Sequence, residues 1–261
     1  MNRYSFVILL TFLSIANSHA QRLILKPKAS STKLEMQSVE GTNGVAVAYN
    51  GSYKKYYAII AGNTTFPIET FNTSGGKSIH TIACGFDSRG LWYNPSTSTL
   101  EGNGYYDYGW YQMYLNEDGT PDGWPYNIFY GYNQPEDQSV GAYDWTNNEV
   151  LFYSYGYIYR YDRNTGYYLS SYSLYNCPVD WANINSTTVI YTGYNHVQLG
   201  VLDYVNKKIY LFDKETGEYK HTVSLPEDAN TTDLFRVSFA NDHLWLYDVT
   251  TRVWTGYKMF K

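Results

Sequence analysis

The chain has 261 residues, with 19 Lys and Arg against 24 Asp and Glu, so its formal net charge at pH 7 is −5. No cluster of Lys or Arg stands out, which argues against nucleic acid or an anionic membrane surface as a partner. Aromatic residues make up 19% of the chain and include 31 Tyr, whereas charged residues reach only 16%. Because Tyr suits the half-buried surface of a sheet, this composition indicates an all-β protein.

The first twenty residues have the pattern of a secretory signal peptide. Arg3 supplies a positive charge, residues 6–13 form an apolar run, and Ser18-His19-Ala20 resembles a small-residue cleavage site. The apolar run is too short to span a bilayer as a helix, although a membrane anchor is the alternative interpretation. We therefore expect cleavage after Ala20, a secreted or periplasmic protein without membrane insertion, and one domain over residues 21–261.

A turn signature recurs along the rest of the chain. A large apolar or aromatic residue is followed by Asn or Asp and, in all copies but the last, by Gly three or four positions later. The Asn or Asp residues stand at spacings of 44, 46, 51 and 35 residues, at Asn72, Asn116, Asp162, Asp213 and Asp248. Repeats of about 40–50 residues with several short strands each are typical of β-propeller blades.

Alternating apolar patterns and turn residues divide these repeats into strands. The third repeat shows all four strands of a blade, at residues 139–145, 149–155, 157–161 and 167–174. The first repeat shows four as well, at residues 44–49, 55–60, 67–71 and 77–82. The last repeat shows three, at residues 235–239, 243–247 and 253–260, so residues 22–26 or 33–36 are candidates for its fourth strand. We predict five four-stranded blades closed by an N-terminal strand, although the 51-residue spacing leaves room for an irregular sixth.

The turn sequence aromatic-Asp-x-x-Thr-Gly, seen at residues 161–166 and 212–217, resembles that of the broad NHL, YVTN-like and kelch-like group of propellers. The resemblance covers nearly all of the chain after residue 20. It implies a propeller fold, and it implies no particular chemistry, because many unrelated propellers share this turn.

Propeller topology sorts the connections of each blade onto two faces. Turns from the first to the second strand and from the third to the fourth lie on one face, here called the turn face, and are mostly tight. Second-to-third loops and blade-to-blade connections lie on the opposite, loop-rich face. The long segments expected there are residues 94–109, 130–137, 175–181 and 226–230. Long loops on a rigid scaffold often carry binding residues, so we expect the site on the loop-rich face.

The candidate site combines aromatic rings with polar side chains. The expected stacking surfaces are Tyr105, Tyr106, Trp110, Tyr132 and Trp181, and the expected hydrogen-bonding residues are Asp137, Asp180 and His196. Such a surface suits a flat polar ligand such as a carbohydrate, or a protein. The alternative is that these rings only pack the loops onto the sheets.

No catalytic motif is evident. His80, His196, His221 and His243 lack metal-ligand spacing, and no nucleophile elbow or phosphate-binding glycine loop is present, so we expect neither metal nor cofactor. The sequence therefore favours a monomeric, non-enzymatic binding or interaction module. The first alternative is a carbohydrate-active hydrolase or lyase with paired carboxylates on the loop-rich face, for which Asp137, Asp180 and Asp228 are candidates. The second is a structural component of the cell exterior.

The two cysteines, Cys84 and Cys177, follow the outer strands of the first and third repeats. Two blades apart, they are expected to exceed the separation of about 7 Å that a disulfide tolerates. We predict two unpaired, largely buried thiols.

Overall fold

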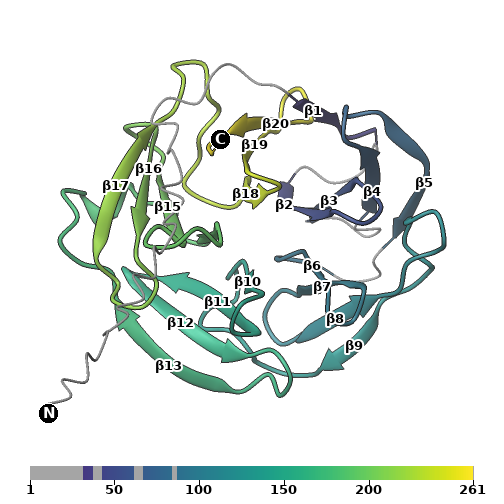
Figure 1. The fold of residues 1–261 in the computed structure, drawn as a ribbon, viewed down its shortest axis with the longest axis horizontal. Coiled ribbons are helices and arrows are strands. Elements are labelled where there is room, and N and C mark those ends of the chain that lie inside the picture. The colour runs from purple at the N-terminus through teal and green to yellow at the C-terminus, as the bar shows by residue number, and fades with distance from the viewer. Residues whose placement is uncertain (1–31, 38–42, 62–66, 84–86, 261) are drawn as a thin grey trace, which may run out of the picture.

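The structure is a computed structural model and describes residues 32–37, 43–61, 67–83 and 87–260. These residues form five four-stranded antiparallel sheets arranged as blades around a central channel, as Figure 1 shows, which confirms the predicted five-bladed β-propeller. The proposed signal peptide (residues 1–20) and Cys84 lie outside the described residues.

Each blade runs from an inner strand at the channel to an outer strand at the rim. Blade 1 consists of β2 (Asn43–Asn50), β3 (Lys55–Ala61), β4 (Pro67–Asn72) and β5 (Lys77–Ala83). Blade 2 consists of β6 (Trp92–Asn94), β7 (Thr99–Asn103), β8 (Trp110–Met113) and β9 (Tyr126–Phe129). Blade 3 consists of β10 (Ala142–Asp144), β11 (Glu149–Ser154), β12 (Tyr157–Asp162) and β13 (Tyr168–Ser173). Blade 4 consists of β14 (Ile190–Tyr191), β15 (Leu199–Asp203), β16 (Lys208–Phe212) and β17 (Tyr219–Ser224).

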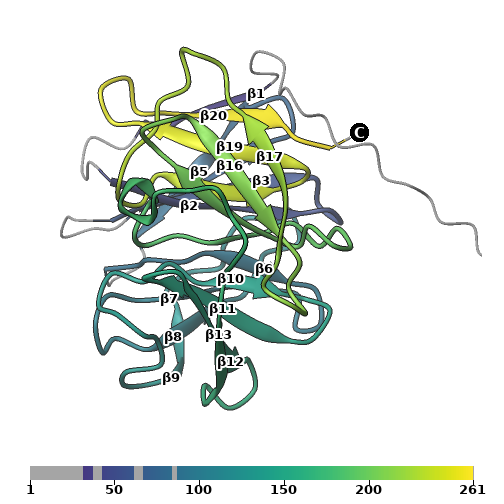
Figure 2. The ribbon, with the colours of Figure 1, turned by 90° about the vertical axis from the view of Figure 1, so that its left-hand side faces the viewer.

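Blade 5 joins the two ends of the described chain. Its inner three strands are β18 (Val237–Ala240), β19 (His243–Asp248) and β20 (Val253–Lys258), and its outer strand is β1 (Thr32–Glu35). Figures 1 and 2 show β1 beside β20, where Leu34 faces Trp254 and is fully buried. The predicted closure by an N-terminal strand is therefore confirmed, and residues 33–36 are the segment that provides it.

Polar contacts as well as apolar packing hold neighbouring blades together. The Ser238 hydroxyl in blade 5 accepts a hydrogen bond from Val47 N (3.0 Å) and donates one to Val47 O (2.9 Å) in blade 1. Arg163 of blade 3 binds Glu101 of blade 2, and Lys214 of blade 4 binds Asp144 of blade 3, with all four side chains buried. Arg163 and Lys214 each directly follow the Asp of a recurrent turn, so the repeat also positions a cation against the preceding blade.

The recurrent turns form as the residue types predict. Asp162 Oδ1 accepts hydrogen bonds from the backbone N–H groups of Asn164 (2.7 Å) and Thr165 (2.8 Å), and Gly166 adopts the positive φ of 70° that ends the turn. The fifth copy differs in place: Asp248 stands between the second and third strands of blade 5, on the loop-rich face. The other four copies stand between third and fourth strands, which explains the short spacing of 35 residues.

Two parts of the predicted loop map need correction. Residues 94–109 are not one long loop, because β7 lies within them and leaves residues 104–109 as the second-to-third loop of blade 2. The turn face is also less uniformly tight than expected, since residues 114–125 and 192–198 form longer connections there. Among the described residues no helix is long and apolar enough to cross a membrane.

Candidate functional site

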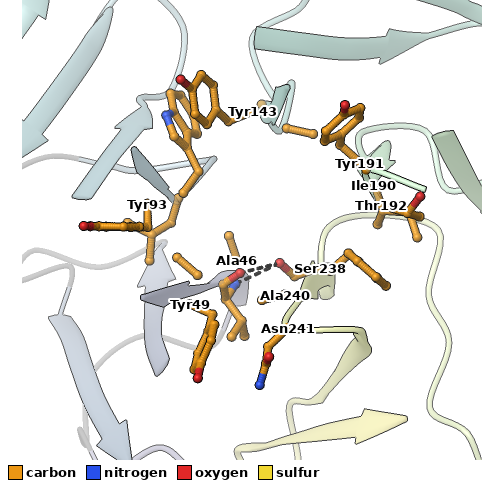
Figure 3. A pocket seen from close by; sticks show the side chains of 18 of the residues that line it. Ala46, Tyr49, Tyr93, Tyr143, Ile190, Tyr191, Thr192, Ser238, Ala240 and Asn241 are labelled. Atoms are coloured by element: carbon orange, nitrogen blue, oxygen red, sulfur yellow. Dashed lines mark hydrogen bonds between the residues drawn. The ribbon is translucent and has the colours of Figure 1, made fainter. Parts of the chain in front are cut away.

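A cavity of about 540 Å³ occupies the central channel and opens toward the turn face. All five inner strands line it, and Figure 3 shows their side chains arranged around it. Its walls are mainly aliphatic, formed by residues such as Leu91, Val140, Val189, Ile190 and Val237. Small and β-branched residues are needed here because the five blades converge at the axis.

An aromatic ring from every blade stands near the open end of this cavity. The last or next-to-last residue of each inner strand supplies it, namely Tyr49, Tyr93, Tyr143, Tyr191 and Phe239. Trp145, which is half exposed, and Tyr194 add two more rings from the first-to-second turns of blades 3 and 4. Trp145 packs edge-on against Tyr191 with centroids 4.8 Å apart. A Cβ at position 193 would lie 2.2 Å from the Trp145 ring, and the φ of 74° also favours glycine there. The mouth of the cavity is therefore an aromatic rim.

Arg89 closes the other end of the channel. Its guanidinium lies over the ring of Tyr105 at 4.8 Å and over that of Phe235 at 5.3 Å. Asp87 binds the same guanidinium, and Gln138 Oε1 accepts a hydrogen bond of 2.7 Å from Arg89 Nε. Arg89 precedes the inner strand of blade 2 and Phe235 that of blade 5, and these blades are not neighbours, so the contact reaches across the channel. The cavity is consequently a blind pocket.

Asp242 is the carboxylate of the pocket mouth. Tyr194 donates a hydrogen bond of 2.5 Å to Asp242 Oδ1, and burial together with this bond raises the pKa of Tyr194 above its usual value. Asn241 and Asp242 form the tight turn between β18 and β19, with φ values of 52° and 61°. Asn and Asp tolerate this left-handed conformation. Asn241 Nδ2 also donates a hydrogen bond to Tyr56 Oη (2.6 Å), which fixes the turn against blade 1.

A buried ion pair lies behind the rim. Lys214 Nζ is 2.5 Å from Asp144 Oδ2, and both side chains are almost completely buried. Tyr191 donates a hydrogen bond to Thr146 Oγ1 (3.2 Å). Burial is the largest cause that raises the pKa of Tyr191, and the nearby Asp144 carboxylate raises it further. The rim tyrosine is thus held in its neutral form, and the nearby Lys charge is already neutralised.

The loop-rich face brings several of the predicted site residues together. The Tyr106 ring contacts those of Tyr105 and Tyr132, with centroid distances of 6.1 and 5.4 Å. Tyr132 Oη donates a hydrogen bond of 2.5 Å to Asp137 Oδ1, which, with burial, raises the pKa of Tyr132. Tyr106 and Tyr132 are about half exposed.

A groove of about 640 Å³ extends from Asp137 along this face. Trp181, which is 36% exposed, and Tyr155 supply its aromatic surface, and Glu136 lies beside Asp137 at its edge. Asp180 has a local role, because its carboxylate caps the short 3₁₀ helix η1 (Trp181–Asn183) by accepting a hydrogen bond from Ala182 N at 3.1 Å.

Two predicted site residues lie elsewhere. Trp110 is fully buried at the start of β8 and packs against Trp92 and Phe129, so it belongs to the core and offers no surface to a ligand. His196 lies on the turn face, in the first-to-second loop of blade 4, where its Nδ1 is 2.8 Å from Asp213 Oδ2. The face of this loop cannot be read from the sequence, because the inner strand of blade 4, β14, has only two residues and no alternating pattern.

Other candidate chemistry is limited among residues 32–37, 43–61, 67–83 and 87–260. No group of three His, Cys, Asp or Glu side chains in these ranges could hold a metal ion. Cys177 has a free thiol that is only partly buried, and desolvation raises its pKa to about 12, which makes it a poor nucleophile.

Comparisons with known proteins identify the fold and no family. No protein-family model matches the chain, and no curated protein matches its sequence. Among solved structures, the chain is similar to the crystal structure of Myxococcus xanthus glutaminyl cyclase. The TM-score is 0.57 and the sequence identity is 8%, over 89% of this chain and 96% of that chain. The fold is a β-propeller. The finer resemblance to the NHL, YVTN-like and kelch-like group gains no support from a family match.

The same likeness corrects the expected function. The sequence favoured a non-enzymatic binding module, but the solved protein that this fold covers almost completely is an enzyme. That finding conflicts with the first expectation and agrees better with the alternative of an enzyme. Because 729 solved chains match, the reaction does not follow from the fold and must be argued from the site.

Proposed function

We propose that this protein is an enzyme that moves a proton at the polar end of a substrate whose apolar part enters the blind channel pocket. The observation that carries the proposal is the hydrogen-bonded pair Tyr194–Asp242 at the only open end of a pocket sealed behind by Arg89, within the part of the chain that the structure describes. A substrate can therefore enter from one side only, and its outer end stops beside a carboxylate.

The chemistry of this pair suits general acid–base catalysis. A carboxylate has two oxygens, so the bond from Tyr194 to Asp242 Oδ1 leaves Oδ2 able to accept a proton from a substrate group or a water molecule. The raised pKa of Tyr194 keeps its hydroxyl protonated, so its single O–H remains bonded to Asp242 Oδ1 and orients the carboxylate. Hydrolysis, elimination and intramolecular transfer each need such a proton transfer. The signal-peptide pattern of residues 1–20 supports an exported enzyme.

Turnover assays on two substrate panels test this proposal. One panel consists of peptides with N-terminal glutamine, the substrate class that the name of the solved neighbour suggests, with ammonia release as the readout. The other consists of aryl glycosides and uronate oligosaccharides. Asp242→Asn should lower kcat/KM by about 100-fold or more, because it removes the proton acceptor but keeps the side chain's shape. Asp122→Asn, at an exposed carboxylate that does not line the channel pocket, is the matched control. Full activity in Asp242→Asn, or no turnover on either panel, contradicts the proposal.

A second candidate function is a carbohydrate-active hydrolase or lyase whose site is the groove on the loop-rich face. Glu136 and Asp137 both line this groove, together with Trp181 and Tyr155, whose rings suit stacking on a sugar. Asp137→Asn separates the two candidates. Loss of turnover on glycosides in Asp137→Asn, with normal turnover in Asp242→Asn, would assign the reaction to the groove.

A further inference from the structure

The charge of the channel pocket is set by one side chain. Among the described residues that line the pocket, Asp242 is the only one that carries a charge at neutral pH, and Lys, Arg, His and Glu are absent from the lining. The buried cations around the pocket are paired with carboxylates: Lys214 with Asp144, Arg163 with Glu101, and Arg89, at the far end of the channel, with Asp87. The pocket therefore presents a negative potential at its mouth, which opposes the entry of anions.

Hydrogen-bond donors are also scarce inside the pocket. The hydroxyl of Ser238 is occupied by the backbone of Val47, and the hydroxyl of Thr192 donates to the carbonyl of Val197 at 2.8 Å. The hydroxyl of Thr188 shares a hydrogen bond with that of Thr187 (3.2 Å), and most of the remaining inner wall is aliphatic. A neutral polar group placed there would lose its hydrogen bonds to water without replacement, so the interior favours apolar substituents.

The rim supplies what an ammonium ion needs. Aromatic rings attract cations through their negative faces, and this attraction strengthens where water is excluded. Tyr49, Tyr194 and Trp145 line the mouth together with the Asp242 carboxylate. Burial holds Tyr143 and Tyr191 in their neutral phenol form, so these rings add no charge of their own. Rings, one carboxylate and an aliphatic interior together form a site for a cation with apolar substituents.

We propose that the channel pocket recognises an organic ammonium group, with the cation held between Asp242 and the aromatic rim and its alkyl or aryl substituents inserted into the channel. This inference rests on the proposed function, since the ammonium would be the polar end of the substrate. An amine terminus of a peptide and a free alkylamine share this chemistry. Carboxylates and phosphates are excluded as the inserted group.

Calorimetric titration of the full protein with four small probes tests the inference. The probes are butyltrimethylammonium, n-butylammonium, butanol and butyrate, which have similar apolar parts and differ in charge. We expect both ammonium probes to bind at least 10-fold more tightly than butanol, and butyrate to bind most weakly. Equal binding of butanol and n-butylammonium, or no binding of either ammonium probe at 20 mM (roughly the limit for a weak cation–aromatic site), overturns the inference.

Variants assign the binding to the rim. Asp242→Asn should reduce ammonium affinity about 10-fold and leave butanol binding unchanged, because it removes the charge without changing the cavity. Trp145→Ala should reduce affinity for butyltrimethylammonium by a similar factor. Trp124→Ala is its matched control, since Trp124 is 66% exposed and does not line the pocket. Unchanged ammonium affinity in both rim variants contradicts the inference.

The outcome is separable from that of the enzyme assays. If a neutral substrate is turned over, activity is lost in Asp242→Asn, and the ammonium probes show no preference, the proposed function stands and the ammonium inference fails. If the ammonium probes bind as expected and no substrate of either panel is turned over, the pocket is an ammonium-binding site and the proposed catalytic function fails.

Discussion

The ion pair between blades 2 and 3 provides a sharp test of how the ring is held together. Arg163 donates two hydrogen bonds of 2.6 Å to the carboxylate of Glu101, whose side chain is fully buried. Glu101 accepts further hydrogen bonds from Trp92 Nε1 and Asn94 Nδ2, each at 3.0 Å. Arg163→Met removes the counter-charge and leaves a buried carboxylate with neutral donors only.

The expected loss can be worked out from these contacts. Breaking a buried pair by removing one partner costs about 3–5 kcal/mol, and the remaining donors to Glu101 favour the lower value. A loss of about 3 kcal/mol corresponds to a fall in Tm of about 6–12 °C for a protein of this size. Glu101→Gln in the same chain removes the uncompensated charge, so the double variant should regain about 2 kcal/mol.

Arg160→Met is the matched control for Arg163→Met. Arg160 binds Glu149 through the same two-bond geometry, but within one blade and with a third of its own side chain exposed. Because Glu149 is nearly buried, the loss of Arg160 should cost about 1–2 kcal/mol, less than the loss of Arg163. Urea denaturation of the three variants and the wild-type protein measures these differences. If Arg163→Met unfolds at the same urea concentration as Arg160→Met, or if the double variant is no more stable than the single one, the reasoning is refuted.

Three further predictions concern closure, blade packing and pH. Leu34→Ala should cost about 3 kcal/mol, because Leu34 is fully buried in the closing strand; a Tm equal to that of the exposed neighbour variant Glu35→Ala would contradict this. Ser238→Ala leaves two buried backbone groups of Val47 without partners and should cost about 1–3 kcal/mol in urea denaturation, so an unchanged midpoint would count against the role of this contact. For Asp213, burial raises the pKa, but hydrogen bonds from His196 and nearby backbone groups outweigh it, so the pKa lies below the usual 3.8. A carboxyl group whose pKa is lower in the folded state than in the unfolded state stabilises the fold at pH values above its unfolded-state pKa. This stabilisation is lost as the pH falls through the folded-state pKa. Asp213→Asn should therefore flatten the fall of Tm below about pH 4, and parallel curves for variant and wild type would disprove this.

The fold was predictable because its signals are local. Asn and Asp side chains bond the next backbone N–H groups, and Gly supplies positive φ, so the turns at Asp162 and Asp213 can be read from the sequence alone. The same locality accounts for the fifth copy of the signature. Asp248 accepts the same backbone hydrogen bonds in a turn between different strands, and local chemistry cannot distinguish the two positions.

The candidate site was harder to predict because it is assembled from five distant strands. Loop length predicted a site on the loop-rich face, where Tyr106, Tyr132 and Asp137 do meet. The channel pocket instead has its rim on the face with shorter turns. A signal for it exists in the sequence, since the rim residues repeat at spacings of 44, 50, 48 and 48 residues, at Tyr49, Tyr93, Tyr143, Tyr191 and Phe239. Strand propensity explains a Tyr at each of these positions equally well, so the spacing alone does not mark them as pocket residues.

The pairing of β1 with β20 has a consequence for the order of folding. Thr32 faces Gly256, so this contact joins residues from opposite ends of the described chain, whereas the hairpins within a blade join near neighbours. Contacts of such long sequence separation form late, because the entropy of closing the intervening chain must be overcome first. Pulsed hydrogen exchange during refolding should protect β12 amides before those of β1, whose only neighbour in the sheet is β20, and simultaneous protection would contradict this order. A chain that emerges from a ribosome or translocon N-terminus first therefore holds β1 unpaired until β20 arrives. Every product that is truncated before β20 keeps an open sheet edge, which exposes it to proteases and to aggregation.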